Sequence, residues 1–441
     1  MNVLSLLKNR AARNAGWIVA CKLVQAALGL LVSMVTARYL GPSQYGLVSY
    51  AVSIATFLTP AAQLGLTATL VHEMIRSPEE EGKILGTSIA MSMLSSLVCI
   101  LGASLFVSVT NPGEAVTLRV CQLYSLLLLA QGAELTLYWF QTKLLSKYTA
   151  LTTLVIYVMI SLYQILILIK GRSLYLYVIS KALEHGMIAA VLLVFYRRLG
   201  GQKLRFSFQQ AKNLFQRSRH FMLASLMIMA YAQADRIMIR NMIGDAAMGF
   251  YAAAVMCANL TDFIFMAIID SLRPVVLDAK RRNRKAFENG MSALYAIVFY
   301  MVLVQSVMIT LFARPMILLM CGSEYLPAVQ TLRIIVWYTA FSYIGSARSI
   351  WITAESKQRV LWMVNLSGAA LNIALNLAMI PVWGIEGAAV ASLITQIFVN
   401  VIAGYLIAPL KGNNQLLLKG LNPKAVLVLL KHKSASAGGN S

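Results

Sequence analysis

Long runs of apolar residues recur along the whole chain, separated by short polar segments. A helix needs about 20 apolar residues to cross the hydrocarbon core of a bilayer, and twelve segments meet this requirement. They are residues 16–38, 45–70, 84–109, 117–140, 148–169, 173–196, 220–241, 249–272, 288–312, 329–354, 360–380 and 385–408. Because these runs are continuous rather than alternating, they predict helices and not the strands of an outer-membrane barrel. We therefore predict an all-α, multi-pass membrane protein.

Composition strengthens this prediction, because 59% of the 441 residues are apolar and only 12% are charged. A net charge of +22 would indicate nucleic-acid binding in a soluble protein. If the spans alternate in direction, however, 27 of the 38 Lys and Arg residues fall on one side, 7 on the other and 4 within spans. This asymmetry places both termini and the long loops in the cytoplasm. The net positive charge then follows from the Lys and Arg residues of the cytoplasmic loops, and we expect no nucleic-acid partner.

Sequence patterns of enzymes and metal sites are missing from the chain. There is no P-loop, G-x-S-x-G or H-E-x-x-H pattern. The five Cys residues are scattered, without a His partner at ligand spacing. A polyprenyl glycosyltransferase or ligase usually carries a large outer loop, whereas the longest outer loop predicted here is residues 313–328. We therefore expect no enzyme activity, no metal and no cofactor.

A short motif, [LI]-G-x-x-x-[YM]-G-[LF], occurs twice at an offset of 203 residues, at 40–47 and 243–250. Each copy joins an odd span to an even span on the same predicted side. Two six-span halves in the same orientation are typical of transporters built from repeats that are related by an axis along the membrane normal. The alternative is a single bundle with coincidental turns. The predicted parts are an N-terminal lobe at 1–196, a basic cytoplasmic linker at 197–219, a C-terminal lobe at 220–408 and a cytoplasmic tail at 409–441.

Three segments resemble one known family. They are Asn14-x-x-Trp17 with residues 36–46 (TARYLGPSQYG), residues 234–238 (ADRIM) running into 244–252, and residues 380–391 (IPVWGIEGAAVA). In these segments the chain resembles polysaccharide flippases of the O-antigen or capsule type, in the multidrug/oligosaccharidyl-lipid/polysaccharide exporter superfamily. The small or rigid residues expected at the turns are Gly41, Pro42, Gly46, Gly244, Gly249, Pro381, Gly384 and Gly387.

The resemblance implies two six-helix lobes around a central cavity that opens alternately to each side of a bacterial cytoplasmic membrane. The implied substrate is an undecaprenyl-pyrophosphate-linked oligosaccharide, moved from the inner to the outer leaflet for O-antigen, capsule or exopolysaccharide synthesis. The implied partners are this substrate, membrane lipids and the polysaccharide polymerase machinery. Lipid II flippases usually have fourteen spans, so twelve spans favour the O-antigen or capsule branch. A cation-coupled drug or metabolite antiporter of the same superfamily is the alternative.

Four cations lie within predicted spans: Lys22, Lys181, Arg236 and Arg348. Each ionisable residue inside the membrane costs roughly 2.5–3.5 kcal/mol on insertion scales, so it needs a partner or a wet cavity. Lys and Arg can replace the hydration of a pyrophosphate that leaves water. We predict that Lys22 and Arg348 bind the headgroup, with Arg236 and Lys181 as further substrate-binding candidates. The alternatives are snorkelling to the interface and an interlobe salt bridge.

Acidic residues and one histidine within spans are candidates for coupling transport to H⁺ or Na⁺. Lys181, Glu184 and His185 share one helix face, which predicts either a self-compensated pair or a proton-coupling cluster. Asp262 lies near the middle of the eighth span without a cation nearby in the sequence. The further candidates are Asp235 and Glu134, and Asp235 has a structural ion pair as its alternative.

A polar stripe runs along the eleventh span, where Asn365, Gly368, Asn372 and Asn376 recur at helical spacing. Asparagines that face a cavity can bind the hydroxyl groups of a sugar. Asparagines beside a small residue can equally well form hydrogen bonds between helices. The sequence leaves both interpretations open.

Overall fold

A computed structural model of the chain describes residues 10–171, 173–357 and 360–422, with the backbone alone for residues 10–20. The first nine residues of the predicted N-terminal lobe, and residues 423–441 of the predicted tail, lie outside this description. The described residues form helices and turns, and none of them is in a β-strand. The described residues divide into two compact units, the N-terminal unit (10–249) and the C-terminal unit (250–422).

Nine helical segments among the described residues are long and apolar enough to cross a membrane. Two of these segments contain a kink at a glycine with positive φ, Gly41 (68°) and Gly384 (60°), so each contains two helices. A further helix, α14 (Ala328–Ala354), has 27 residues. Counting both sides of each kink and adding α14 gives twelve long helical segments among the described residues, the same number as the predicted spans. The prediction of an all-α, multi-pass membrane protein is therefore confirmed.

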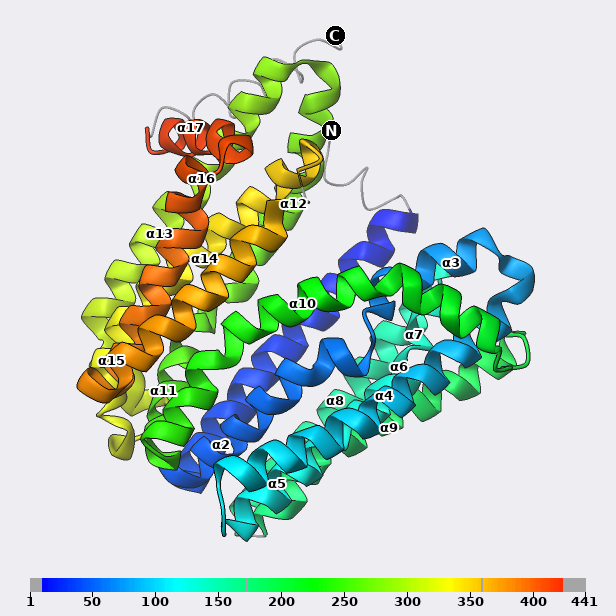
Figure 1. The fold of residues 1–441 in the computed structure, drawn as a ribbon, viewed down its shortest axis with the longest axis horizontal. Helices are drawn as coiled ribbons and strands as arrows, with labels where there is room; N and C mark the ends of the chain where they lie inside the picture. The colour runs from blue at the N-terminus through cyan, green and yellow to red at the C-terminus, as the bar shows by residue number, and fades with distance from the viewer. Residues whose placement is uncertain (1–9, 172, 358–359, 423–441) are drawn as a thin grey trace. The chain divides into compact units, whose positions relative to one another are not determined.

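The N-terminal unit is a bundle of long helices with short connections (Figure 1). Its helices are α2 (Arg10–Ala62), α3 (Leu70–Arg76), α4 (Glu81–Thr110), α5 (Ala115–Ser125), α6 (Leu127–Glu134), α7 (Leu137–Thr142), α8 (Ser146–Ile169), α9 (Leu174–Arg198) and α10 (Phe208–Met242), followed by the start of α11 (Asp245–Ala258). The span predicted at 117–140 is divided into α5, α6 and α7. Helix α10 packs against α2 and α4, so this unit continues past the linker predicted at 197–219.

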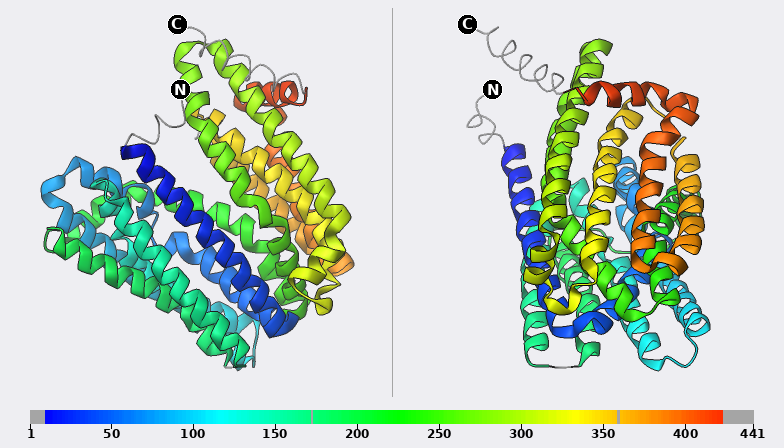
Figure 2. Two further views of the ribbon diagram at one scale, coloured as in Figure 1. Left: turned by 180° about the vertical axis from the view of Figure 1, so that it is seen from behind. Right: turned by 90° about the vertical axis from the view of Figure 1, so that its left-hand side faces the viewer.

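The C-terminal unit comprises the rest of α11 and the helices that follow it. They are α12 (Asp262–Arg282), α13 (Arg284–Met320), α14, α15 (Leu361–Ile397), the π-helix Phe398–Ile402, α16 (Ala403–Leu406) and α17 (Lys411–Gly420). Helix α17 contacts α13 and lies across one end of the long helices of this unit (Figure 2). In the core, the rings of Phe265 and Tyr343 stack with their centroids 4.3 Å apart.

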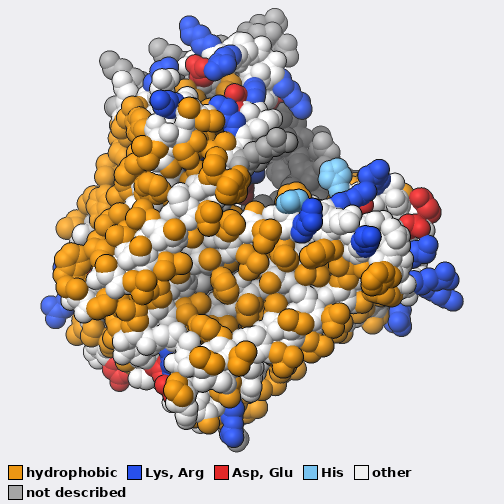
Figure 3. Space-filling model, in the orientation of Figure 1, with side chains coloured by type: hydrophobic (Ala, Val, Ile, Leu, Met, Phe, Trp, Pro, Cys, Tyr) orange, Lys and Arg blue, Asp and Glu red, His pale blue; other side chains and the backbone are white. Residues whose placement is uncertain are grey.

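Helix α4 shows how the surface and the interior differ in chemistry. One face carries exposed apolar side chains at Leu94, Val98, Leu101 and Leu105. The opposite face carries buried serines that bond to neighbouring helices: Ser92 donates to the Ala62 carbonyl (2.9 Å) and Ser96 to the Leu128 carbonyl (2.9 Å). Apolar side chains outside and small polar residues between helices are typical of membrane bundles. Figure 3 shows the same trend, with apolar side chains along the helices and Lys and Arg gathered mainly at the helix ends.

Candidate functional site

The two copies of the repeated motif pack directly against each other within the N-terminal unit. A Cβ atom built on Gly46 would lie 1.8 Å from the carbonyl oxygen of Asp245, and one built on Gly249 would lie 2.0 Å from the carbonyl oxygen of Pro42. Only glycine fits at either position. Gly244 has a φ of +123°, which lets the chain turn between α10 and α11. We call this contact the glycine crossing.

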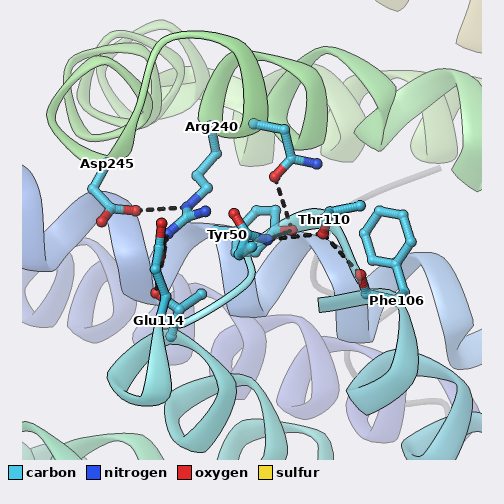
Figure 4. Close-up of polar contacts among 9 residues, drawn as sticks. Tyr50, Phe106, Thr110, Glu114, Arg240 and Asp245 are labelled. Carbon is cyan, nitrogen blue, oxygen red and sulfur yellow. Dashed lines mark hydrogen bonds and ion pairs between the residues drawn. The ribbon is translucent and has the colours of Figure 1, made fainter. Parts of the chain in front are cut away.

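A buried arginine lies beside the glycine crossing (Figure 4). The Arg240 side chain is only 4% exposed and forms ion pairs with Glu114 and with Asp245, the latter through its Nε at 2.8 Å. A further Arg240 N–H donates to the Thr117 hydroxyl at 3.0 Å. The guanidinium also lies over the Tyr50 ring, 5.0 Å from its centroid. Arg240 thereby joins the end of α10 to α2, α5 and the start of α11.

The Tyr50 hydroxyl extends this network. It donates to the Asn241 side-chain oxygen at 3.1 Å and accepts from the Asn111 amide at 3.3 Å. Glu114 lies between α4 and α5, where the Thr117 hydroxyl and then the Arg240 guanidinium hold the pKa of its carboxyl below the ordinary value. Arg240 is one of the seven Lys and Arg residues that the predicted topology places on the outer side, and the sequence did not predict this network. The available signal was the acid at Asp245, directly after the second motif's first glycine.

A second polar cluster lies inside the N-terminal unit, on α9 and α6. Lys181 pairs with Glu184 at 2.8 Å, as their spacing predicts, and the Lys181 ammonium lies 5.3 Å from the centroid of the Tyr157 ring. His185 Nδ1 lies 2.6 Å from a carboxylate oxygen of Glu134. The last contact joins two separate helices, so residue spacing alone did not reveal it. We call these four residues, Glu134, Lys181, Glu184 and His185, the α6–α9 cluster.

The α6–α9 cluster can hold one proton without leaving an excess charge. With His185 neutral, one cation and two carboxylates give a net charge of −1, and a proton on His185 brings the sum to zero. The side chains of His185 and Glu134 are partly exposed, at 25% and 19%. The geometry is therefore suited to taking up and releasing a proton.

The remaining candidates of the N-terminal unit are on α2 and α10. Lys22 is exposed and forms no ion pair or hydrogen bond with any residue that the structure describes. Arg236 is half-buried and donates to the side-chain oxygen of Gln233 at 3.3 Å. Asp235 is buried and accepts the backbone N–H of Arg236 at 2.8 Å. The predicted roles of these three residues stay predictions.

In the C-terminal unit, Arg348 is buried, with 2% of its surface exposed. It donates to the Val399 carbonyl at 2.6 Å, and Val399 belongs to the π-helix. Its Nε has no hydrogen-bond partner among the described residues, and no described carboxylate pairs with it. A π-helix shifts the backbone bonding pattern by one residue and often occurs at functional sites. The headgroup role of Arg348 stays a prediction, and it requires that α14 and the π-helix separate.

The asparagine stripe lies between the two halves of α15. The Asn372 amide approaches the hydroxyls of Ser392 (3.4 Å) and Thr395 (3.5 Å), and the Asn376 amide donates to the Asn372 side-chain oxygen at 3.0 Å. Both asparagines are buried, whereas Asn365 is half-buried. These contacts favour the interpretation that Asn372 bonds the two halves of α15 together, while Asn376 bonds to Asn372 within its own half.

The bend that brings the two halves of α15 together is built from small residues. Gly384 adopts the left-handed conformation, and a Cβ on Gly387 would lie 2.2 Å from the Met379 carbonyl oxygen. Pro381 lies within the helix three residues before the bend. The sequence segment 380–391 therefore forms a tight helical hairpin.

Asp262 lies at a break within the eighth predicted span. The short 3₁₀ turn Asn259–Thr261 separates α11 from α12, and Asp262 is the first residue of α12, exposed at its surface. The Tyr343 side chain lies beside its carboxyl group. Its role in ion coupling stays a prediction. Within the described residues, no group of three or more His, Cys, Asp or Glu side chains is arranged to hold a metal ion.

Solved structures share this fold at low sequence identity. The lipid II flippase MurJ, in an inward closed conformation, is 15% identical with a TM-score of 0.72, over 94% of this chain and 92% of that chain. An inward-facing multidrug resistance MATE family transporter of the MOP superfamily is 13% identical with a TM-score of 0.67, over 90% and 95%. A MOP superfamily transporter from Pyrococcus furiosus is 12% identical with a TM-score of 0.60, over 94% and 98%.

The sequence itself matches a family model. The model describes polysaccharide biosynthesis proteins and matches residues 11–280, which include the whole N-terminal unit from α2 onward and the glycine crossing. A comparison with curated proteins gave no match. The family match confirms the resemblance to polysaccharide biosynthesis proteins seen in the sequence motifs, and the fold is shared with solved flippases and transporters. Because the family model covers more than half of the chain, the protein belongs to the family of polysaccharide biosynthesis proteins.

Proposed function

We propose that the protein is a flippase that moves lipid-linked oligosaccharide units from the cytoplasmic to the outer leaflet of a bacterial cytoplasmic membrane. Two alternately accessible states would carry the sugar across, for O-antigen, capsule or exopolysaccharide synthesis. The observation that carries the proposal is the family match over residues 11–280. A multi-pass chain without an enzyme motif contributes to polysaccharide synthesis most simply by transporting an intermediate.

Lys22 is the cation best suited to meet the diphosphate of such a substrate. Its ammonium is exposed and forms no ion pair with a described residue, so no carboxylate of the protein has to be displaced. Arg236 is the second candidate, because its described partner is the neutral side chain of Gln233. A lipid diphosphate leaving water gains charge-assisted hydrogen bonds from such groups. Under this proposal both termini lie in the cytoplasm, and membrane lipids and the polymerase machinery are the partners.

The α6–α9 cluster is our candidate for coupling transport to protons. Charged groups at membrane depth are costly, so they usually face water or one another and mark ion pathways. Protonation of His185 would neutralise a cluster that otherwise carries one negative charge, and its bond to Glu134 joins α9 to α6. A proton can thereby change the strength of a helix–helix contact. Asp262, at the break between α11 and α12, is the second candidate and suits H⁺ or Na⁺.

The test is made in a deletion strain complemented with variants. Membrane lipids are extracted and searched by mass for a complete lipid-linked repeat unit, while surface polymer is measured in parallel. We expect the deletion strain to accumulate the unit on the inner leaflet and to lose the polymer. Lys22→Ala should fail to restore polymer despite normal insertion, whereas Lys147→Ala, which removes an exposed lysine of α8, should restore it. Full restoration by Lys22→Ala would refute the headgroup role of this residue.

The second candidate function is a cation-coupled drug antiporter. Its support is the fold shared with multidrug transporters. The same deletion strain separates the two functions. Intact surface polymer, no accumulated lipid-linked unit and altered resistance to cationic compounds would favour the antiporter and overturn the flippase proposal.

A further inference from the structure

The connection between α9 and α10 is a fixed, extended segment rather than a loose linker. We call residues 200–207 the strap. The backbone N–H of Arg205 donates to the Gly82 carbonyl at 3.2 Å, and that of Ser207 donates to the Thr87 hydroxyl at 3.0 Å. The Gln202 side chain accepts from the Gly82 N–H (3.1 Å) and donates to the Pro78 carbonyl (3.0 Å). The strap is therefore bonded along its length to the start of α4.

Two glycines of α4 let the strap approach without a gap. A Cβ on Gly82 would lie 2.6 Å from the Lys203 carbonyl oxygen, and one on Gly86 would lie 2.7 Å from the backbone nitrogen of Arg205. The Tyr196 hydroxyl closes the other end by donating to the Gln202 carbonyl at 2.6 Å. The backbone of the strap contacts the backbone of α4 directly. The positions of the strap side chains are therefore fixed relative to α4.

Side chains alternate in character along the strap. Leu204 and Phe206 are exposed by 37% and 60%, and they alternate with Lys203 and Arg205. Phe208, the first residue of α10, is exposed by 80%. In an extended chain, alternate residues point to opposite sides. The strap joins the ends of two spans and lies against the start of a third. Since spans end where the membrane meets water, we place the strap at the depth of the membrane–water interface. Aromatic side chains favour that depth, while cations there contact lipid phosphates.

The cationic side of the strap lines a pocket of about 320 Å³ against the start of α4. Its lining comprises Glu79, Lys83, Gln202, Lys203 and Arg205, that is, three cations and one carboxylate. Lys83 is bonded to Glu80 at 3.0 Å, and Glu80 lies outside the lining. Lys203 and Arg205 form no ion pair with any residue in the described part of the chain. Lys203 and Arg205 can therefore pair with an anion that enters the pocket.

We propose that this pocket binds the phosphate of an anionic phospholipid of the surrounding leaflet. Lys203 and Arg205 contact the phosphate, the Gln202 amide fixes the strap, and Leu204 and Phe206 insert beside the acyl chains. The site is separate from the α6–α9 cluster and from Lys22. Its ligand is a lipid rather than a free phosphate, because apolar side chains alternate with the cations on the same strap.

The test measures lipid binding by the full-length protein. Delipidated protein is titrated with phosphatidylglycerol or phosphatidylcholine and the retained lipid is counted by native mass spectrometry. We expect a preference for phosphatidylglycerol that Lys203→Ala/Arg205→Ala weakens about 30-fold, at about fivefold per cation near a membrane surface. Lys212→Ala/Arg219→Ala removes two exposed cations of α10 that lie outside the pocket, and it should keep the preference.

Two outcomes overturn the proposal. One is an equal loss of preference in both double variants, which would mean that net charge alone attracts the lipid. The other is competition by glycerol phosphate as effective as that by the lipid, which would make the pocket a site for a soluble phosphate. Leu204→Ser/Phe206→Ser provides the complementary measurement, because it should weaken lipid binding while leaving the cations in place. Each variant must elute as a monodisperse species, so that unfolding is not mistaken for lost binding.

Discussion

Gly46→Ala tests whether the glycine crossing holds the N-terminal unit together. The added Cβ would lie 1.8 Å from the Asp245 carbonyl oxygen, whereas real Cβ contacts essentially never fall below 3.0 Å. The two backbones must therefore move apart by at least 1.2 Å. A shift of that size would also move the Arg240 guanidinium away from the Tyr50 ring of α2, whose centroid lies 5.0 Å from it.

The expected cost is about 3 kcal/mol, the upper end for overpacking, because the opposing atom is backbone and cannot rotate away. At about 2–4 °C per kcal/mol for a unit of this size, the unfolding midpoint should fall by roughly 6–12 °C. A thiol-reactive dye can report the transition, since all five cysteines are free and buried: Cys21, Cys99, Cys121, Cys257 and Cys321.

The matched control is Gly102→Ala on α4, where an added Cβ meets no atom within 4 Å. This variant should be unchanged or stabilised by up to about 1 kcal/mol, because alanine favours helix more than glycine does. If Gly46→Ala and Gly102→Ala unfold at the same temperature, the crossing is not the rigid contact that we describe, and the reasoning fails.

Three further predictions concern ionisable groups. His185→Gln should abolish the dependence of transport into proteoliposomes on an imposed proton gradient, because a glutamine side chain cannot take up the proton. His72→Gln, which changes an exposed histidine, should keep this dependence. Proton-driven transport that persists in His185→Gln would remove the α6–α9 cluster from the coupling proposal. Because the folded-state pKa of Glu114 is lowered, its ion pair with Arg240 should stabilise the protein above the ordinary carboxyl pKa of about 4.3 and lose that effect as pH falls through the lowered value. Melting curves of wild type and Glu114→Gln should therefore converge in acid, and parallel curves would contradict the assignment. Arg348→Met should melt at or above the wild-type temperature, because it replaces a buried cation that has no described carboxylate partner; a large loss of stability would show that the bond to Val399 is essential.

The sequence predicted those parts of the structure that depend on neighbouring residues. The apolar runs predicted the spans, and the repeated glycines marked the places where α2 kinks and α10 turns into α11. The pair of Lys181 and Glu184 followed from their spacing on one helix. Contacts between distant segments could not be predicted in this way: Glu134 meets His185 only because α6 packs beside α9, and Arg240 meets Glu114 across 126 residues.

Burial was equally hard to predict. Arg348 and Lys22 look alike in the sequence, as single cations in apolar runs. The structure makes Arg348 buried and Lys22 exposed, and this difference depends on the helices that pack around each one. The π-helix that receives the Arg348 bond carries no recognisable sequence signal, because it differs from an α-helix by one residue of bonding register.

The packing of α10 against α2 and α4 has a consequence for the order of synthesis. During translation α2 and α4 enter the membrane long before α10, which begins at Phe208. The face of α2 that carries Gly46 cannot form its contact with the second motif until this motif, which ends at residue 250, has left the ribosome. Domains generally fold as units as they emerge. The N-terminal unit, however, is still without α10 when the first six predicted spans have been inserted. A nascent chain stalled before residue 208 should therefore carry an unfinished unit, with its most closely packed contact still open to lipid or to an insertion chaperone.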